Sequence, residues 1–145
     1  MTTRNIEHHI DINASPAVVW KHLADTAAYG QWNPFVRQLS GELSEGATLT
    51  IRVAPPGGRA MTLKPTVLAA EVGRELRWLG HFLVPGLFDG EHSFLLEELS
   101  GGRTRLVQAE RFRGLLVGLS GATLEKTRLG FEQMNRALKQ RAEAA

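Results

Sequence analysis

The chain has 145 residues, is 43% hydrophobic and 22% charged, carries a net charge of +2 and contains no cysteine. These values are typical of one globular domain, here residues 1–145, and the missing cysteines exclude disulfides, zinc–thiolate sites and a thiol nucleophile. The small positive excess comes without basic patches interleaved with aromatic residues, so nucleic-acid binding is not expected.

No stretch of the sequence resembles a membrane span or the apolar core of a signal peptide. A spanning helix needs roughly 18 apolar residues in a row, and no run approaches that length. The first five residues lead directly into an alternating strand pattern. We therefore expect a cytoplasmic protein without a membrane span.

The first part of the chain predicts a strand and two short helices. Residues 5–13 alternate between apolar and polar side chains, which indicates a half-buried strand. Ser15 and Pro16 are typical of a helix start, and this helix should end near Ala24. A second helix or turn is expected over residues 26–31, because Pro34 disfavours helical backbone at Asn33.

The middle of the chain predicts six further strands separated by turn residues. Pro65 lies inside one of them and argues for an edge position or a bulge. Consecutive strands joined by hairpins form an antiparallel sheet, so the sequence predicts seven strands in all with one covered face. The six segments are residues 36–39, 48–53, 61–72, 75–82, 90–98 and 104–112.

A long amphipathic helix is predicted over residues 115–143, and it is the natural cover for the sheet. Gly118 and Gly121 weaken its beginning, and Gly130 lies inside it. Gly130 indicates either close packing on the sheet or room for a ligand. The residues with helical spacing are Leu116, Leu119, Thr123, Thr127, Phe131, Met134 and Leu138.

Polar residues interrupt the inward faces of the last two strands. His92 lies beside Phe94 and Leu96, and Gln108 and Glu110 share a face with apolar residues. Burying an unpartnered charge in a solid core is costly. The pattern therefore predicts a cavity with a few polar groups, the arrangement by which small ligands are held and oriented.

Several motifs resemble the SRPBCC (START-like) superfamily, which includes polyketide cyclases/dehydrases and lipid-transport proteins. The resemblance covers about residues 5–142 and implies the helix-grip fold: a curved, seven-stranded antiparallel sheet around a long C-terminal helix, with two short helices after the first strand and a largely apolar cavity between sheet and helix. The motifs are Val19-Trp20-x-x-Leu23-x-Asp25, Tyr29-x-x-Trp32-Asn33-Pro34-Phe35, Leu76-x-Trp78-x-Gly80, Gly90-Glu91-His92-x-Phe94-x-Leu96, Glu110-x-Phe112-x-Gly114 and Gly130-Phe131-x-x-Met134-Asn135.

His92 and Glu110 are the candidate catalytic residues, and each also has a structural interpretation. His92 can anchor the polar end of a ligand or bond to a neighbouring group. Glu110 can act as a general acid or base, or pair with His92 or an arginine. The candidate ligand-binding residues are Trp32, Asn33, Trp78, His92, Phe94, Gln108, Glu110, Thr127, Phe131 and Met134.

Three functions remain open from the sequence. The leading one is binding of a small hydrophobic or amphipathic ligand, such as a lipid, a polyketide or an aromatic metabolite. The first alternative is a cyclase/dehydratase-type enzyme that uses an acid/base pair in the same cavity. The second is a co-chaperone-like interaction module, which would need an exposed apolar patch on the outer face of the sheet. No metal or cofactor motif is found, and the oligomeric state, a homodimer included, stays open.

Overall fold

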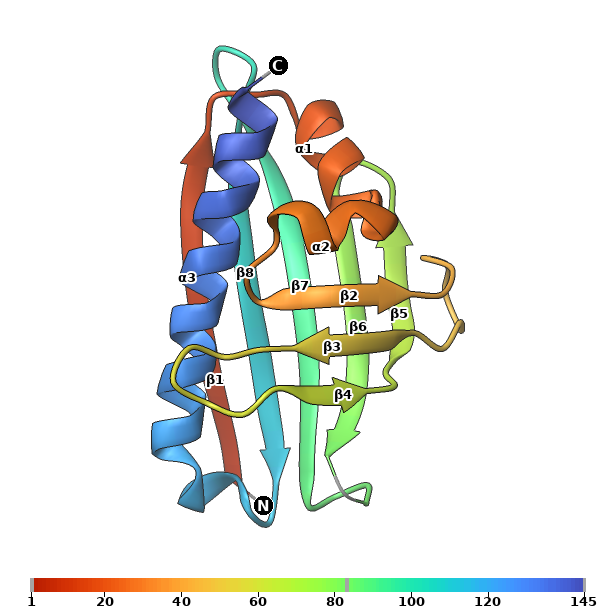
Figure 1. The fold of residues 1–145 in the computed structure, drawn as a ribbon, viewed down its shortest axis with the longest axis vertical. Helices are drawn as coiled ribbons and strands as arrows, with labels where there is room; N and C mark the ends of the chain where they lie inside the picture. The colour runs from red at the N-terminus through yellow and green to blue at the C-terminus, as the bar shows by residue number, and fades with distance from the viewer. Residues whose placement is uncertain (1, 83, 145) are drawn as a thin grey trace.

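The computed structural model describes residues 2–82 and 84–144, and it consists of two antiparallel sheets and a long C-terminal helix (Figure 1). In chain order the elements are β1 (Thr2–Ile12), α1 (Pro16–Ala24), the 3₁₀ turn η1 (Thr26–Ala28), α2 (Tyr29–Trp32), β2 (Val36–Ser40), β3 (Thr50–Val53), β4 (Met61–Leu63), β5 (Thr66–Glu71), β6 (Glu75–Phe82), β7 (Phe88–Leu99), β8 (Arg103–Gly114), the 3₁₀ turn η2 (Val117–Leu119) and α3 (Gly121–Glu143).

The larger sheet has the strand order β1-β8-β7-β6-β5, with every neighbouring pair antiparallel. Its long hairpin β7–β8 turns at Gly101 and Gly102, which both adopt the left-handed backbone that glycine tolerates best (φ 80° and 71°). The first strand of the chain thus pairs with the last one, and α3 runs along them (Figure 1).

The smaller sheet, β2-β3-β4, crosses in front of the larger one (Figure 1). The predicted strand over residues 61–72 is divided into β4 and β5 at Lys64 and Pro65. Pro65 has no N–H to donate to a ladder, whereas its carbonyl accepts from the backbone N–H of Leu49 at 2.8 Å. The prediction of seven strands in one sheet is therefore corrected to eight strands in two sheets over the described residues.

The C-terminal helix begins at Gly121, later than the predicted start at residue 115. The backbone N–H groups of Leu115 and Leu116 donate to the carbonyls of Gly86 and Leu87 instead of entering a helix. Leu119 is consequently 87% exposed, although the helical spacing predicted it to face the sheet. Glycine gives this segment only a weak preference for helix, so its backbone pairs with the β6–β7 connection instead.

The hydrophobic core fills the space between the two sheets and α3. The helix lies close on the smaller sheet's side because Gly130 packs directly against the ring of Phe35, where a Cβ atom would collide. This is the close-packing interpretation of Gly130. The largest fully buried apolar side chains include Tyr29, Phe94, Phe131, Ile12, Leu23, Leu49, Ile51, Leu76, Leu106, Met134 and Leu138.

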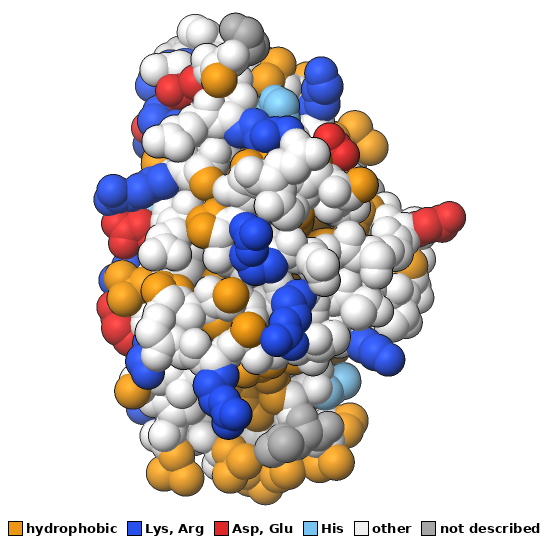
Figure 2. Space-filling model, in the orientation of Figure 1, with side chains coloured by type: hydrophobic (Ala, Val, Ile, Leu, Met, Phe, Trp, Pro, Cys, Tyr) orange, Lys and Arg blue, Asp and Glu red, His pale blue; other side chains and the backbone are white. Residues whose placement is uncertain are grey.

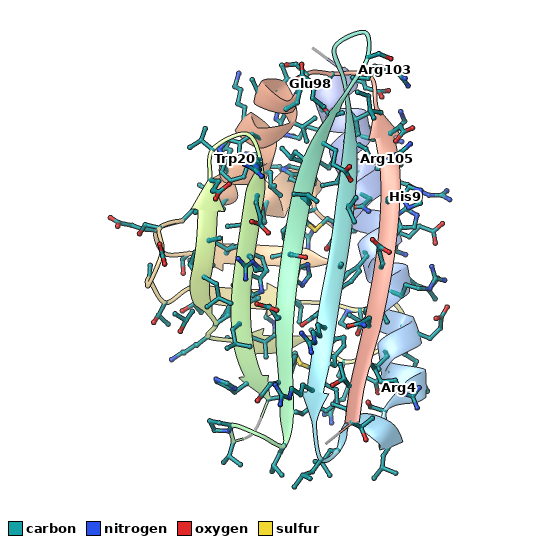
Figure 3. All side chains as sticks on the ribbon, turned by 180° about the vertical axis from the view of Figure 1, so that it is seen from behind. Arg4, His9, Trp20, Glu98, Arg103 and Arg105 are labelled. Atoms are coloured by element: carbon teal, nitrogen blue, oxygen red, sulfur yellow. The ribbon has the colours of Figure 1, made fainter. Side chains whose placement is uncertain are left out.

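The outer face of the larger sheet carries polar and charged side chains (Figure 3). Arg105 pairs with Asp11 at 2.8 Å, and Arg77 pairs with Glu91 at 3.1 Å. The large hydrophobic residues that are exposed in the described part of the chain lie outside the strands, in turns, η2 and α3. None of the described helices has both the length and the hydropathy needed to cross a membrane.

Candidate functional site

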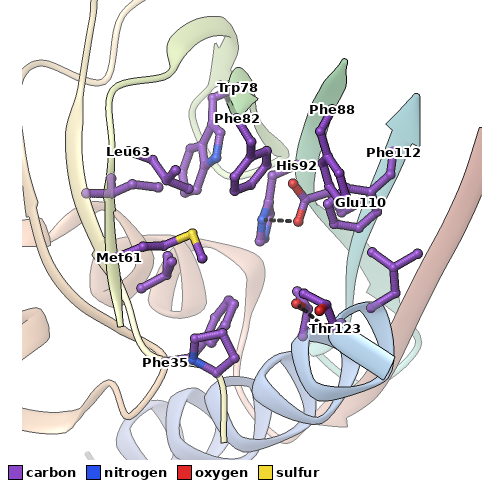
Figure 4. A pocket seen from close by; sticks show the side chains of 15 residues that line it. Phe35, Met61, Leu63, Trp78, Phe82, Phe88, His92, Glu110, Phe112 and Thr123 are labelled. Carbon is purple, nitrogen blue, oxygen red and sulfur yellow. Dashed lines mark hydrogen bonds and ion pairs between the residues drawn. The ribbon is translucent and has the colours of Figure 1, made fainter. Parts of the chain in front are cut away.

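A cavity of about 220 Å³ opens between the smaller sheet, the larger sheet and the first half of α3 (Figure 4). Most of its wall is aliphatic or aromatic, and Figure 2 shows hydrophobic side chains in a recess on the lower part of this face. Among its described lining residues the polar side chains are His92, Glu110, Thr123 and Thr127. The remaining lining residues are Phe35, Ile51, Val53, Pro55, Met61, Leu63, Trp78, Phe82, Phe88, Phe112 and Leu124.

Three site residues form one row across the larger sheet. Trp78 on β6 is the direct register partner of His92 on β7, and His92 is the direct partner of Glu110 on β8. Directly opposed residues of antiparallel strands point to the same face of the sheet. The alternation of the three strands therefore places all three side chains in the cavity wall, as Figure 4 shows.

The ring of His92 packs among aromatic rings, and the residue is only 4% exposed. Its ring centre lies 5.0 Å from that of Trp78, 4.8 Å from that of Phe94 and 4.9 Å from that of Phe131. Its Nδ1 atom lies 3.4 Å from Oε1 of Glu110, which is itself 8% exposed. The imidazole and the carboxyl are thus paired with each other in the wall of the cavity.

A chain of buried amides continues from His92 towards α3 and β1. Nε2 of His92 lies 2.9 Å from Oε1 of Gln108, and Nε2 of Gln108 donates to Oδ1 of Asn135 at 2.7 Å. Nδ2 of Asn135 in turn lies 2.9 Å from Nδ1 of His8 and donates to the His8 backbone oxygen at 3.0 Å. Gln108 and Asn135 are both 0% exposed, so this relay is dry.

Half-buried His8 forms the outer end of this relay. Burial lowers the pKa of His8, and the positive charges of Arg128 and Arg136 lower it further, while Glu132 opposes the shift. A neutral ring suits the contact with Asn135, because only an unprotonated Nδ1 can accept from the amide N–H. His8 therefore tends to stay neutral where an exposed histidine would take up a proton.

Trp32 and Asn33, both predicted as ligand-binding residues, are not among the described residues that line the cavity. The carboxamide oxygen of Asn33 accepts from the backbone N–H groups of Phe35 and Val36, at 3.0 Å and 2.9 Å. The indole of Trp32 packs edge-on against Tyr29, with ring centres 5.3 Å apart. Asn33 therefore holds the turn between α2 and β2, and Trp32 packs within α2.

The other predicted site residues divide between the wall and the layer behind it. Thr127 lines the cavity together with Trp78, His92 and Glu110. Phe94, Gln108, Phe131 and Met134 are fully buried behind the wall. Gln108 is linked to the cavity through its contact with His92, as described above.

Several lining residues were missed by the sequence analysis, although a signal for some was present. Phe82 shares the strand parity of Trp78, and Phe88 shares the parity of His92, so following the alternation past the glycines would have found both. Asn135 was noted only as part of a family motif. Its role depends on which strand the helix crosses, and the sequence does not contain that information directly.

The described residues include no group of three or more histidine, aspartate or glutamate side chains placed to hold a metal ion. The arrangement offers other chemistry, because a paired imidazole and carboxyl lie in the wall of a largely apolar cavity. Such a site can bury a small ring and orient one polar group, or exchange a proton with it.

Solved structures with the same fold include proteins of quite different descriptions. The Zhui aromatase/cyclase from a Streptomyces species is 20% identical, with a TM-score of 0.71 over 98% of this chain and 94% of that chain. A START superfamily protein from Mycobacterium smegmatis is 18% identical, with a TM-score of 0.75 over 97% of each chain. A hypothetical protein from Helicobacter pylori is 15% identical, with a TM-score of 0.78 over 96% of this chain and 88% of that chain.

Identities this low establish the fold and not the activity. No curated protein matches the sequence. The family model described as polyketide cyclase/dehydrase and lipid transport, however, matches residues 3–143, which is nearly the whole chain. The strand order, the gripping helix and this match agree, and the chain belongs to the polyketide cyclase/dehydrase and lipid transport family.

Proposed function

We propose that the cavity binds a small, mainly apolar ring compound, such as an aromatic or polyketide-like metabolite, with its polar end at Glu110 and His92. The observation that supports this proposal most is the cavity, whose wall is made mainly of apolar strand and helix side chains and contains one buried polar pair. Burial of apolar ligand surface contributes about 25 cal/mol per Å², from which the cost of immobilising the ligand is subtracted.

The size of the cavity favours a compact ligand over a long lipid. Its volume of about 220 Å³ lies below the range of roughly 300–1,000 Å³ that is usual for drug-sized ligands. Phe82, Phe88 and Phe112 stack edge-to-face along one side, with ring centres 5.2 Å and 5.5 Å apart. Aromatic side chains can stack on a ring ligand or meet it edge-to-face, contacts that a flexible acyl chain cannot make.

A cyclase/dehydratase-type activity is the second candidate, and the His92–Glu110 pair favours it. General acid–base catalysis needs a proton-exchanging group within reach of the substrate in a site sheltered from water. Glu110 lines the cavity and is paired with His92 at 3.4 Å. If the protein has this activity, Glu110→Gln should abolish turnover of a polyketide substrate while leaving its binding within a few-fold.

Filling the cavity tests the binding proposal. Met61 lines the cavity from β4, whereas the next residue, Thr62, is exposed on the opposite face of the same strand. Met61→Trp should weaken the binding of thymol, a compact phenol, at least tenfold in a calorimetric titration, while Thr62→Trp should leave it unchanged. Equal binding by both variants, or no binding by the unaltered protein, contradicts the proposal.

A further inference from the structure

The buried relay behind His92 has one end whose direction is fixed. The backbone oxygen of His8 can only accept a hydrogen bond, so the group of Asn135 that faces it must be the amide nitrogen. Oδ1 of Asn135 therefore faces Gln108 and requires a donor there. The backbone oxygen of Phe131, 3.5 Å from Nε2 of Gln108, imposes the same orientation on that side chain.

The orientation of Gln108 determines the state of the nearer ring nitrogen of His92. Since Nε2 of Gln108 faces two acceptors, its Oε1 atom is the group that faces His92, at 2.9 Å. An amide oxygen only accepts, so Nε2 of His92 must carry a hydrogen. The relay thus sets the tautomer of His92 from outside the cavity.

The other ring nitrogen of His92 is occupied by Glu110. Nδ1 and Oε1 of Glu110 are 3.4 Å apart in a buried site, where two facing lone pairs would repel each other. One proton on either the ring or the carboxyl makes this contact attractive. In both forms neither nitrogen of His92 is free for a ligand.

Glu110 keeps an acceptor for the ligand in both forms. Its Oε2 atom lies over the backbone of Gly90, where any Cβ atom would collide with it. No donor among the described residues forms a hydrogen bond with Oε2. The Glu110 side chain is only 9% exposed, yet it lines the cavity. A carboxyl oxygen that lines the cavity and has no donor from the described side chains is available to accept a hydrogen bond from a bound molecule.

We infer that Glu110 is the polar group that contacts the ligand, that the ligand is a neutral ring compound carrying a hydroxyl donor, such as a phenol, enol or alcohol, and that His92, Gln108 and Asn135 act as positioning residues behind Glu110. This inference rests on the proposed ligand-binding function and specifies its substrate class. Anionic ligands are disfavoured, because their carboxylate would face the oxygens of Glu110, and no lysine or arginine is among the described residues that line the cavity.

Four matched probes of similar size test the ligand class by titration calorimetry: thymol, its methyl ether, the hydrocarbon cymene and the anion cumate. Thymol should bind at least about tenfold more tightly than its methyl ether, which corresponds to about 1.4 kcal/mol. Cumate should bind most weakly. Glu110→Met should remove the preference for thymol over the ether while cymene still binds, and Glu97→Met, an exposed control on β7, should preserve it.

The outcomes separate the inference from the function on which it rests. If cymene, thymol and the ether bind equally to the unaltered protein, the hydroxyl-donor inference is wrong and the binding function stands. If none of the probes binds, the binding function itself fails, and the inference fails with it. Tighter binding of cumate than of thymol would likewise overturn the assignment of Glu110 as an acceptor.

The positioning role has its own spectroscopic readout. In nitrogen NMR, Nε2 of His92 should show the signal of a protonated ring nitrogen in the folded protein, with or without thymol. Gln108→Leu removes the acceptor that holds this hydrogen and should change that signal and reduce the preference for thymol over its ether. An unprotonated Nε2 in the unaltered protein, or an unchanged signal and preference in Gln108→Leu, would refute the relay.

Discussion

The side-chain amide of Asn135 donates to the backbone oxygen of His8 at 3.0 Å and joins the middle of α3 to the middle of β1. The same amide group accepts from Gln108 on β8 at 2.7 Å. One side chain therefore attaches the gripping helix to two strands of the larger sheet and also orients the groups that reach the cavity. Helix packing and the polar end of the site depend on the same hydrogen bonds.

Asn135→Leu should lower the free energy of unfolding by about 1–3 kcal/mol, because it removes the shorter of the two acceptors of the buried Gln108 amide and a donor to the carbonyl of His8. Urea denaturation measures the change. Gln133→Leu is the matched control on the exposed side of the same helix and should stay within about 0.5 kcal/mol. Equal effects of the two substitutions would contradict the structural role of the relay.

Gly130→Ala should destabilise the protein although alanine favours helix by about 1 kcal/mol. The added Cβ atom would meet the ring of buried Phe35, and overpacking of this kind costs about 1–3 kcal/mol. Gly121→Ala is the control, because a Cβ atom there meets nothing within contact distance. Thermal unfolding should rank Gly121→Ala above Gly130→Ala. A stabilising Gly130→Ala would show that the helix lies further from Phe35.

Stability should fall as the pH drops below about 6.5, and His8 should account for part of this slope. Burial lowers the pKa of His8, so below the ordinary histidine value the unfolded chain binds a proton that the folded protein does not. His22, whose pKa is also lowered mainly by burial, adds to the same slope. The loss continues until the pH reaches the lowered values.

The test of this prediction compares the free energy of unfolding at about pH 7.5 and about pH 5.5. Both values lie above the range in which the paired carboxylates titrate, so these groups do not add to the difference; they are Asp11, Glu125 and Glu143. His8→Gln should show a smaller loss between the two conditions than the unaltered protein. The exposed neighbour His9, changed to glutamine, serves as the control. A slope that is identical in His8→Gln would exclude His8 as a contributor.

The sequence predicted the parts of the fold that follow from local alternation. Strand parity placed Trp78, His92 and Glu110 on one face, and the register then made them direct neighbours in one row. A candidate pairing of His92 with Glu110 was already implied by adjacent antiparallel strands. These predictions succeeded because the period of two is imposed by the backbone and is little affected by tertiary context.

The features that the sequence missed depend on contacts between distant segments. The start of α3 moved to Gly121 because residues 115 and 116 pair with the β6–β7 connection. The division at Pro65 depends on how the smaller sheet crosses the larger one, and the role of Asn135 depends on which strand α3 meets. None of these relationships has a local periodicity from which it can be inferred.

The most direct test of the central claim is an NMR measurement of which methyl groups contact bound thymol. Binding in the cavity predicts intermolecular NOEs from the thymol ring to the methyl groups of Met61, Leu63 and Leu124, which line it. NOEs confined to the exposed Leu119, with none to the three cavity residues, would contradict the account.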